Sequence, residues 1–321
     1  MQENKNIELP LFDDFLLYLK TQNYSEETIY SYERDLRVFE DFLIDYPSPI
    51  NFDRVSKTIV NEYKAYLSSR DRLTSINKNK GKVKLSSYSL NKMLSSFRSY
   101  LKYLVEMDYK VPIAPEAVKL IKTEKKHPKV AEFKKLVELI EAPSKLERNP
   151  KVGLRNRVML ELLFSTGMRI SELCKLDRNV IDETGRIFIM GKGKKERFVY
   201  LTPRARFYLE TYLNKRNDNF PALFIPYRGL NSKSREKRLS INYLQAKIKE
   251  YRENLRINVP TSAHSLRHGF ATYLAEQGAS PAAIQILLGH ESLNTTTRYV
   301  HASDKFAEET HKKFHPLKEV K

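Results

Sequence analysis

Side chains able to do chemistry are concentrated near the C-terminal end of this 321-residue chain. The stretch AHSLRHGFAT places His264, Arg267 and His268 within five positions, and the later stretch LLGHESLNTTTRYVHAS contains His290 and Tyr299. An imidazole exchanges protons near neutral pH, a guanidinium binds an anion through paired hydrogen bonds, and a tyrosine hydroxyl can act as a nucleophile. The grouping raises the question of whether these residues serve one reaction.

A metal site is the first alternative, because His264 and His268 have the spacing of paired metal ligands on a helix. No glutamate lies between them as it does in metalloproteases, the sequence offers no convincing third ligand, and Arg267 in the same turn would repel a cation. Cys174 is the only cysteine, which excludes an intrachain disulfide and a cysteine-rich zinc site. We therefore expect no metal.

Two further motifs resemble binding sites. GRIFIMGKGK suggests a phosphate-binding loop, but five residues separate its first glycine from Gly-Lys and Gly193 follows the lysine, so the pattern of a nucleotide site is not met. SPAAIQILLGHESLNTTTRYV reads as a helix, a glycine turn and a second helix start, which is typical of a helix-turn-helix DNA reader. That segment by itself favours a repressor-like binding module over an enzyme.

Composition bounds the class of protein. The chain has 57 Lys and Arg residues and 39 Asp and Glu residues, so its formal net charge is 57 − 39 = +18. This charge favours a polyanionic partner such as nucleic acid, although a lysine-rich soluble protein is the simpler alternative. The chain is long enough for two domains. It shows neither a signal-peptide pattern nor a run of apolar residues long enough to span a membrane. We therefore expect a cytoplasmic location and no membrane partner.

The first third of the chain is predicted to be a helical bundle. Apolar residues recur at helical spacing in four segments, and Ser25 is the expected N-cap of the second. A basic, glycine-containing loop at 71–86 separates the third helix from the fourth. The four predicted helices occupy residues 11–22, 24–46, 55–69 and 86–107.

The rest of the chain is predicted to be a second, mainly helical domain. Residues 110–130 carry three prolines and six lysines, which indicates an extended interdomain linker whose charge suits contact with phosphates. Alternating apolar residues on both sides of Gly-Lys-Gly predict a β-hairpin at 185–202. Helices are expected at 131–141, 154–167, 170–176, 203–217, 240–255, 264–277, 281–288 and 303–314. The predicted domains are 1–110, a linker at 111–128, and 129–321.

One further motif decides between these interpretations. LLFSTGMRISELCKLD contains Arg169 just after a glycine at a predicted helix boundary, and it is followed in order by GKGKKER, HSLRHGFAT and LLGHESLNTTTRYVH. In this combination the chain resembles the tyrosine recombinases, the integrase family that cuts and rejoins DNA. The resemblance covers nearly the whole chain. It implies a mainly α fold with a small antiparallel β-sheet, in which a helical-bundle core-binding domain precedes a tyrosine-recombinase catalytic domain and a tail helix.

The resemblance also assigns site residues. Glu172 matches an acid that supports the site, His268 is interpreted as a packing or supporting residue, and Lys195 competes with Lys192 for the role of the hairpin lysine. The catalytic residues implied by the family motifs are Arg169, Lys192, His264, Arg267, His290 and the nucleophile Tyr299.

The chemistry implied by the family explains these residue types. Two arginines bind the non-bridging oxygens of a phosphodiester, the histidines accept a proton or hold the phosphate, and Lys192 protonates the departing 5′-oxygen. The tyrosine forms a covalent 3′-phosphotyrosine that conserves the bond energy. The implied enzyme needs no metal, no ATP and no cofactor.

The length and the ending HKKFHPLKEV are similar to Xer-type recombinases, which resolve chromosome dimers at a short palindromic site. The implied partners are double-stranded DNA and a homotetramer on two DNA sites, formed alone or with a paralogous recombinase. The alternatives are a mobile-element integrase or excisionase, a non-catalytic DNA-binding regulator, and a monomeric type IB-like topoisomerase. The full set of catalytic residue types argues against a regulator, and Phe306 and Phe314 on the predicted tail helix favour a multimer over the topoisomerase.

Overall fold

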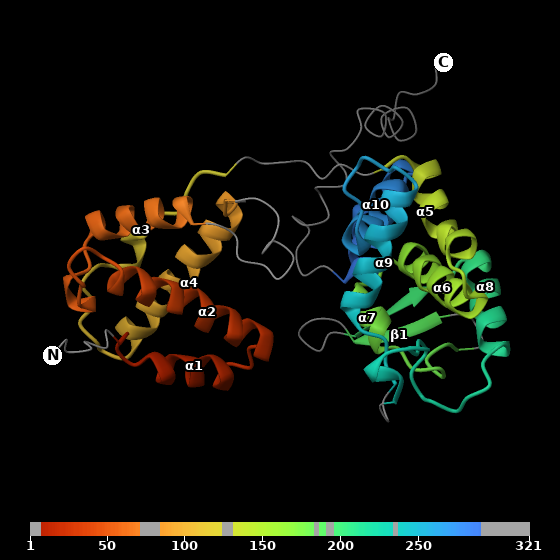
Figure 1. The fold of residues 1–321 in the computed structure, drawn as a ribbon, viewed down its shortest axis with the longest axis horizontal. Coiled ribbons are helices and arrows are strands. Elements are labelled where there is room, and N and C mark those ends of the chain that lie inside the picture. The colour runs from red at the N-terminus through yellow and green to blue at the C-terminus, as the bar shows by residue number, and fades with distance from the viewer. Residues whose placement is uncertain are drawn as a thin grey trace, which may run out of the picture. The chain divides into compact units, whose positions relative to one another are not determined.

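A computed structural model describes residues 8–70, 84–123, 131–182, 186–190, 196–233 and 237–289. The chain divides into two compact units, residues 1–126 and 127–321 (Figure 1). The domain boundaries expected from the sequence remain predictions, and each unit is described separately below. Within the described ranges, no helix is long and apolar enough to cross a membrane.

The first unit is a bundle of helices with an aromatic core. Its helices are α1 (Phe12–Thr21), α2 (Glu26–Ile44), α3 (Lys57–Ser69) and α4 (Ser87–Glu106). Ser25, Ser56 and Ser86 cap the last three, because each hydroxyl accepts a hydrogen bond from a backbone N–H three residues later. The predicted role of Ser25 is therefore confirmed. Phe39 and Phe97 lie at the centre of the bundle with ring centroids 4.2 Å apart.

The segment that was expected to be an extended linker folds in part onto the first unit. Residues Pro115–Ala117 form a short 3-10 turn, and Val118 is fully buried in the core of this unit. The side-chain amide of Asn91 donates to the Ile121 carbonyl (2.8 Å), and the Ile121 N–H donates back to Asn91 Oδ1 (2.7 Å). The prolines and lysines suggested an exposed extension, but the apolar residues between them have a core to pack on.

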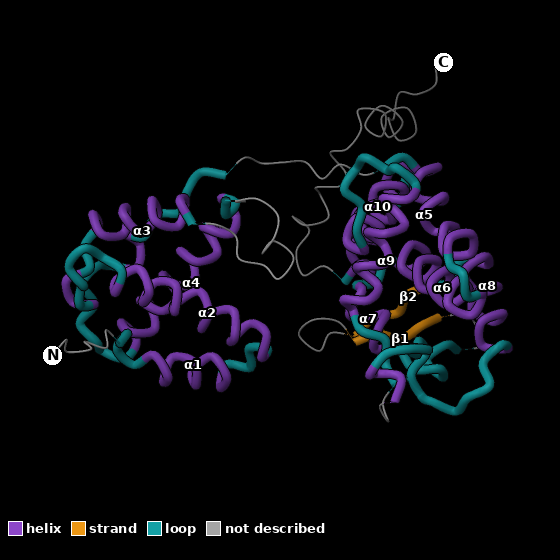
Figure 2. The backbone as a smooth tube through the Cα atoms, viewed as in Figure 1, coloured by secondary structure: helices purple, strands orange, loops and turns teal. Residues whose placement is uncertain are grey.

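The second unit contains the remaining elements of the described chain. They are α5 (Phe133–Leu146), α6 (Pro150–Thr166), α7 (Ile170–Lys175), β1 (Arg186–Met190), β2 (Glu196–Tyr200), α8 (Pro203–Asn214), α9 (Ile241–Asn254), α10 (Ala263–Glu276) and α11 (Pro281–Leu288). Helix α6 is buried along most of its length and packs against α5, α8 and α10 (Figures 1 and 2). A helix buried on all its faces forms the centre of a domain.

The strands form the predicted hairpin, drawn in orange in Figure 2. β1 and β2 are antiparallel, with Ile187 opposite Val199 on the buried face and Phe188 opposite Phe198 on the exposed face. The connecting residues 191–195 lie outside the described part of the chain. The predicted class, mainly α with one small antiparallel sheet, is confirmed.

The described parts of the connection from α8 to α9, residues 226–233 and 237–240, include a 3-10 turn at Leu230–Lys233 and a buried Leu239. Arg238 ties this connection to the end of α7 through the Leu176 carbonyl (3.0 Å) and the Asp177 carboxylate (2.6 Å). Most of the basic loop at 71–86 and all of the predicted tail helix at 303–314 lie outside the described residues.

Candidate active site

The predicted catalytic residues fall into two groups. Arg169, His264 and Arg267 belong to the described part of the second unit. The positions outside the described residues are Lys192, Lys195, His290 and Tyr299. The geometry of the site is therefore built from the first three residues and the elements that carry them.

Arg169 lies at the junction between α6 and α7. Helix α6 ends at Gly167, whose positive φ of 63° is the left-handed conformation that glycine adopts without strain. Arg169 is the N-cap of α7: its N–H donates to Glu172 Oε2 (2.7 Å) and its Nη1 donates to Glu172 Oε1 (2.9 Å). Its side chain is 35% exposed, and its other guanidinium nitrogens donate to no residue that the structure describes. These nitrogens are available to bind an anion.

Arg267 is held in place by two backbone carbonyls. It lies on α10 and is buried, with Nη1 donating to the Gly167 carbonyl (2.7 Å) and Nη2 donating to the Leu288 carbonyl (2.6 Å). Gly167 is required here for a second reason, because a Cβ at this position would come within 2.4 Å of the Phe270 ring. The turn that presents Arg169 thus also anchors Arg267.

His264 lies one turn before Arg267 on α10. Its Nε2 is 2.8 Å from Nε2 of His268, so one ring donates a hydrogen bond to the other and the two rings meet edge to face. His264 keeps much of its surface exposed. Even so, partial burial and the positive charges of Arg267 and Arg169 lower its pKa. The ring is therefore neutral over a wider pH range and can accept a proton.

Arg197 on β2 belongs to the same cluster, although the sequence did not single it out. Its Nη1 and Nη2 donate to Oε1 (3.1 Å) and Oε2 (2.8 Å) of Glu172, and its Nε donates to the Leu287 carbonyl (3.0 Å). The strand alternation could have revealed it, because Arg197 shares the inward face of β2 with the buried Val199. An arginine on that face needs a buried partner.

Glu172 connects the two arginines that bind it. Burial tends to raise the pKa of its carboxyl, but hydrogen bonds from Arg197 and Arg169 outweigh burial and hold the pKa below its ordinary value. The carboxylate therefore stays ionised and orients Arg169. The role expected for Glu172, an acid that supports the site, remains a prediction.

These contacts produce one cationic centre beside an open hollow. Arg169 lines a hollow of about 450 Å³ together with Ser171 and Lys175 of α7 and Phe188 and Met190 of β1. Two guanidinium groups and an imidazole can together bind a phosphate and move a proton. Among the described residues, no group of three or more His, Cys, Asp or Glu side chains is arranged to hold a metal ion.

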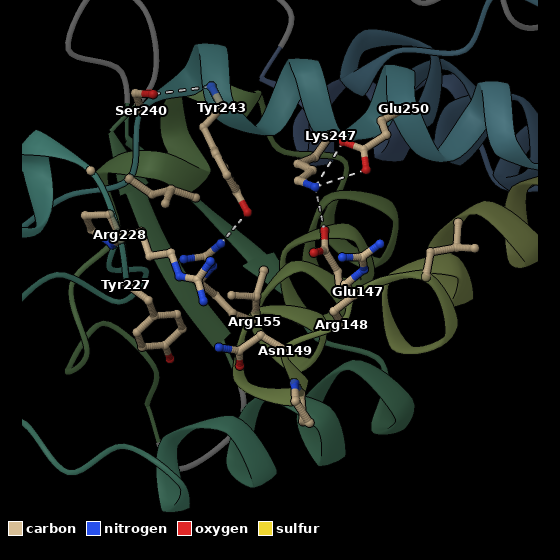
Figure 3. A pocket seen from close by; sticks show the side chains of 16 residues that line it. Glu147, Arg148, Asn149, Arg155, Tyr227, Arg228, Ser240, Tyr243, Lys247 and Glu250 are labelled. Carbon is tan, nitrogen blue, oxygen red and sulfur yellow. Dashed lines mark hydrogen bonds and ion pairs between the residues drawn. The ribbon is translucent and has the colours of Figure 1, made fainter.

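A larger hollow in the second unit is at the opposite end of α6 and has a different character. It has a volume of about 1090 Å³ and lies between the start of α6, the 226–229 segment and α9. Figure 3 shows Tyr243 pointing its hydroxyl toward Arg155, and Lys247 lying between Glu147 and Glu250. Of the predicted catalytic residues that the structure describes, Arg169, His264 and Arg267, none lines this hollow.

Comparison with known proteins assigns the family. Residues 129–305 match the phage integrase family, and residues 12–107 match the N-terminal SAM-like domain of phage integrases. This chain belongs to the phage integrase family. The tyrosine recombinase XerD of Staphylococcus epidermidis is 31% identical over 314 residues, which cover 95% of this chain and 98% of that protein. The tyrosine recombinase XerC of Leptospira interrogans is 32% identical over 308 residues, covering 94% and 92%.

Solved structures agree on the fold of this family member. A post-cleavage complex of the XerH site-specific recombinase with a palindromic difH substrate has a TM-score of 0.71 at 22% identity and covers 97% of this chain and 90% of that one. The Tn1549 transposon integrase in complex with transposon right end DNA has a TM-score of 0.69 at 18% identity, covering 95% and 99%. The recombinase family and the enzyme class expected from the sequence, a tyrosine site-specific recombinase, are thereby confirmed.

Proposed function

We propose that this tyrosine recombinase cleaves and rejoins double-stranded DNA through a covalent 3′-phosphotyrosine on Tyr299. The observation that supports this most is the meeting of Arg169, Arg267 and His264 at the junction of α6, α7 and α10. Two arginines neutralise the charge that spreads over the non-bridging oxygens when one oxygen attacks phosphorus and another leaves. The arginines take the part that metal ions play in other phosphoryl-transfer enzymes.

Each step of the proposed reaction forms one ester bond to phosphorus and breaks another. The Tyr299 oxygen attacks phosphorus and gives its proton to His264 or His290, while the bond from phosphorus to the 5′-oxygen breaks. Lys192 protonates the departing 5′-oxygen. Rejoining reverses these transfers with a 5′-hydroxyl as the nucleophile. The phosphotyrosine retains the energy of the broken bond, so no ATP is consumed.

Within the family, we assign the chain to Xer-type resolution of chromosome dimers at a short palindromic site in the cytoplasm. Support comes from the match to XerD and XerC over nearly the full length of each protein. The second candidate is a mobile-element integrase or excisionase, which the fold shared with the Tn1549 transposon integrase favours. Sequencing the DNA that the purified protein retains would distinguish a chromosomal site from the ends of a mobile element.

We further propose a tetramer on two DNA sites, formed by this chain alone or with a paralogous recombinase. The second unit carries an apolar groove of about 390 Å³ lined by residues that include Phe133, Phe164 and Phe270. The tail sequence DKFAEETHKKFHPL offers Phe306 and Phe314 at helical spacing, suited to such a groove on a neighbour. Head-to-tail contacts of this kind close into a ring when the rotation between subunits allows it. Deleting residues 303–321 should spare binding to one DNA site and abolish pairing of two.

The covalent intermediate has a direct test. A nicked substrate that loses a short 5′ fragment on cleavage traps any protein–DNA adduct, which is then counted on a denaturing gel. Wild type should form the adduct in excess EDTA, and Tyr299→Phe should bind DNA equally well and form none. Adduct formation by Tyr299→Phe would falsify the assignment of the nucleophile.

The lysine assignment has a test of its own. General acid help is worth roughly 10²–10⁴-fold, so Lys192→Ala should cleave slowly on ordinary DNA. Sulfur in place of the 5′-oxygen leaves without a proton and should restore cleavage by Lys192→Ala but not by Arg169→Ala. Lys195→Ala serves as the matched control and should resemble wild type on both substrates. Rescue of Lys195→Ala instead would transfer the role to that residue.

A further inference from the structure

Arg197 makes contacts that reach three separate elements of the second unit. It lies on β2, binds both carboxylate oxygens of Glu172 on α7, and donates through Nε to the Leu287 carbonyl at the end of α11. Its side chain is only 8% exposed, and that of Glu172 is 6% exposed. Arg197 is therefore a buried cation whose charge is matched within the protein, and it is not placed to bind substrate itself.

The end of α11 is held by two arginines in succession. The last carbonyls of a helix lack partners within the helix and carry partial negative charge. Arg197 donates to the Leu287 carbonyl, and Arg267 donates to the Leu288 carbonyl. One of these two arginines is a proposed phosphate ligand, whereas the other also holds the carboxylate that orients Arg169.

The residue that follows these carbonyls is fitted closely to Arg197. Gly289 has a φ of 62°, and a Cβ there would come within 2.9 Å of the Arg197 Cδ. Contact at this distance and a left-handed backbone both require glycine. The side chain of Arg197 therefore fixes where the chain leaves α11, immediately before His290 in the sequence.

We infer that Arg197 is a positioning residue, which locks Glu172 to the end of α11 so that Arg169 and Arg267 address the same phosphate. Without it, Glu172 would keep only Arg169 of the two arginines that bind it, and the Leu287 carbonyl would lose its side-chain donor. A clamp displaced by about 1 Å costs on the order of 10²-fold in rate. This inference rests on the proposed function, because it assigns Arg197 to the alignment of the residues proposed to bind phosphate.

The pH dependence of cleavage distinguishes a positioning role of Arg197 from a purely structural one, because charged groups surround Glu172. Arg169 on α7 and Arg197 on β2 face the carboxylate directly, and Lys175 and Asp177 line the adjoining hollow. Removing Arg197 takes away a partner that lowers the pKa of Glu172, so that pKa rises. Glu172 would then become protonated at a pH where it is ionised in wild type. The acid limb of the cleavage profile should therefore move to higher pH.

The test measures adduct formation on the nicked substrate, DNA binding and the pH profile of cleavage for Arg197→Ala and Arg197→Lys. Arg197→Ala should lose on the order of 10²-fold in cleavage rate, bind DNA as wild type does, and show the shifted acid limb. Arg197→Lys keeps the charge but has one nitrogen in place of three, so it should cleave at an intermediate rate with little shift. If Arg197→Ala does not fold, Arg197→Lys carries the test.

Arg238→Ala is the matched control, because Arg238 braces the other end of α7 through the Leu176 carbonyl and Asp177 without touching Glu172. It should lower the melting temperature and leave the pH profile unchanged. Wild-type cleavage rate and profile in both Arg197 variants would overturn the inference, as would losses that merely follow the melting temperature in the manner of Arg238→Ala. A failure of the proposed function is distinguishable, since wild type and Tyr299→Phe would then give equal adduct.

Discussion

Helix α6 has arginine side chains gathered near each of its ends, with Arg155 in its second turn and Arg169 and Arg267 beyond its last. Arg155 lies eleven residues before the end of α6 at Thr166, which at ~1.5 Å per residue separates the two clusters by roughly 16 Å along the helix. Both clusters lie in the same domain and beside open hollows. Only one of them contains predicted catalytic residues.

At the first end, Arg155 is satisfied by the protein itself. Its guanidinium donates to Asn156 Oδ1, to the Ile225 carbonyl (2.8 Å) and to the Tyr243 hydroxyl, and it lies over the rings of Tyr227 and Tyr243. Only 2% of Arg155 is exposed. The group binds the start of α6 to the 226–229 segment and α9, and it has little capacity left for a ligand.

At the other end, Arg169 is oriented by one partner and stays partly exposed, whereas Arg267 is buried. Arg169 is 35% exposed and spends one guanidinium nitrogen on Glu172, while Arg267 is fixed by two backbone carbonyls at the edge of the same junction. The comparison teaches that burial and charge do not identify a catalytic arginine. What distinguishes Arg169 from Arg155 is a fixed orientation combined with a side chain that remains 35% exposed.

The largest effect is expected on the free energy of unfolding, from substitution of Arg155 near the start of α6. Arg155→Met removes the hydrogen bonds that a buried guanidinium donates to Asn156, Tyr243 and the Ile225 carbonyl, and each hydrogen bond from a charged donor contributes about 1.5–3 kcal/mol. The free energy of unfolding, measured by urea denaturation, should fall by at least ~3 kcal/mol. A loss in the free energy of unfolding below about 1 kcal/mol would mean that water replaces the hydrogen bonds of Arg155 and that this end of α6 does not depend on the arginine for stability.

Beyond the last turn of α6, Arg169→Ala should lower the rate of adduct formation and leave the stability of the protein unchanged. Removing one donor to a developing oxyanion typically costs roughly 10²–10³-fold. We expect a loss of that size in single-turnover adduct formation, with DNA affinity unchanged and the urea midpoint close to wild type. The comparison fails if Arg155→Met, in conditions where it is folded, slows adduct formation as much as Arg169→Ala does.

The same substitution should move the titration of a neighbouring ring. Burial and the charges of Arg267 and Arg169 lower the pKa of His264, so removing the charge of Arg169 raises that pKa and keeps the ring protonated to higher pH. Proton NMR of the imidazole resonances across a pH series measures the shift. Arg155→Met should leave this titration in place, because the charge of Arg155 is roughly 16 Å away along the helix. An unchanged pKa of His264 in Arg169→Ala would show that the charge of Arg169 does not act on His264.

The smallest effect concerns the rim of the large hollow. Arg148 and Arg228 line it, and both are exposed and make no hydrogen bond or ion pair with a described residue. Arg228→Ala should therefore change the free energy of unfolding by no more than ~0.5 kcal/mol. Denaturation in urea beside Arg155→Met provides the comparison. A loss comparable to that of Arg155→Met would show that the buried network extends to the surface.

Much of the fold could be predicted because its elements carry local signals. The helical period located α2 and α4 within about two residues, Ser25 marked a helix start, and alternating apolar residues marked the hairpin. The packing of Val118 was not predicted, because its burial depends on a surface formed by distant residues. A local pattern does not report such packing.

The site was predictable to the extent that motifs fix residue types. The order of the motifs pointed to Arg169, His264 and Arg267, and the geometry of the fold brings these three together. The same reasoning missed Arg197, since GKGKKER drew attention to its lysines and the arginine matters only through Glu172, 25 positions earlier. The predicted roles of Lys192, His290 and Tyr299 remain predictions for the experiments above.

The ion pair between Arg197 and Glu172 has a consequence for how the enzyme responds to ionic strength. Exposed charges are screened over a Debye length of ~10 Å at 0.1 M salt, whereas buried pairs are screened much less, and both of these side chains are under 10% exposed. Binding to DNA releases counterions and weakens steeply as salt rises. We therefore expect salt to govern how often the recombinase occupies its site while leaving the rate of cleavage within each bound complex nearly constant.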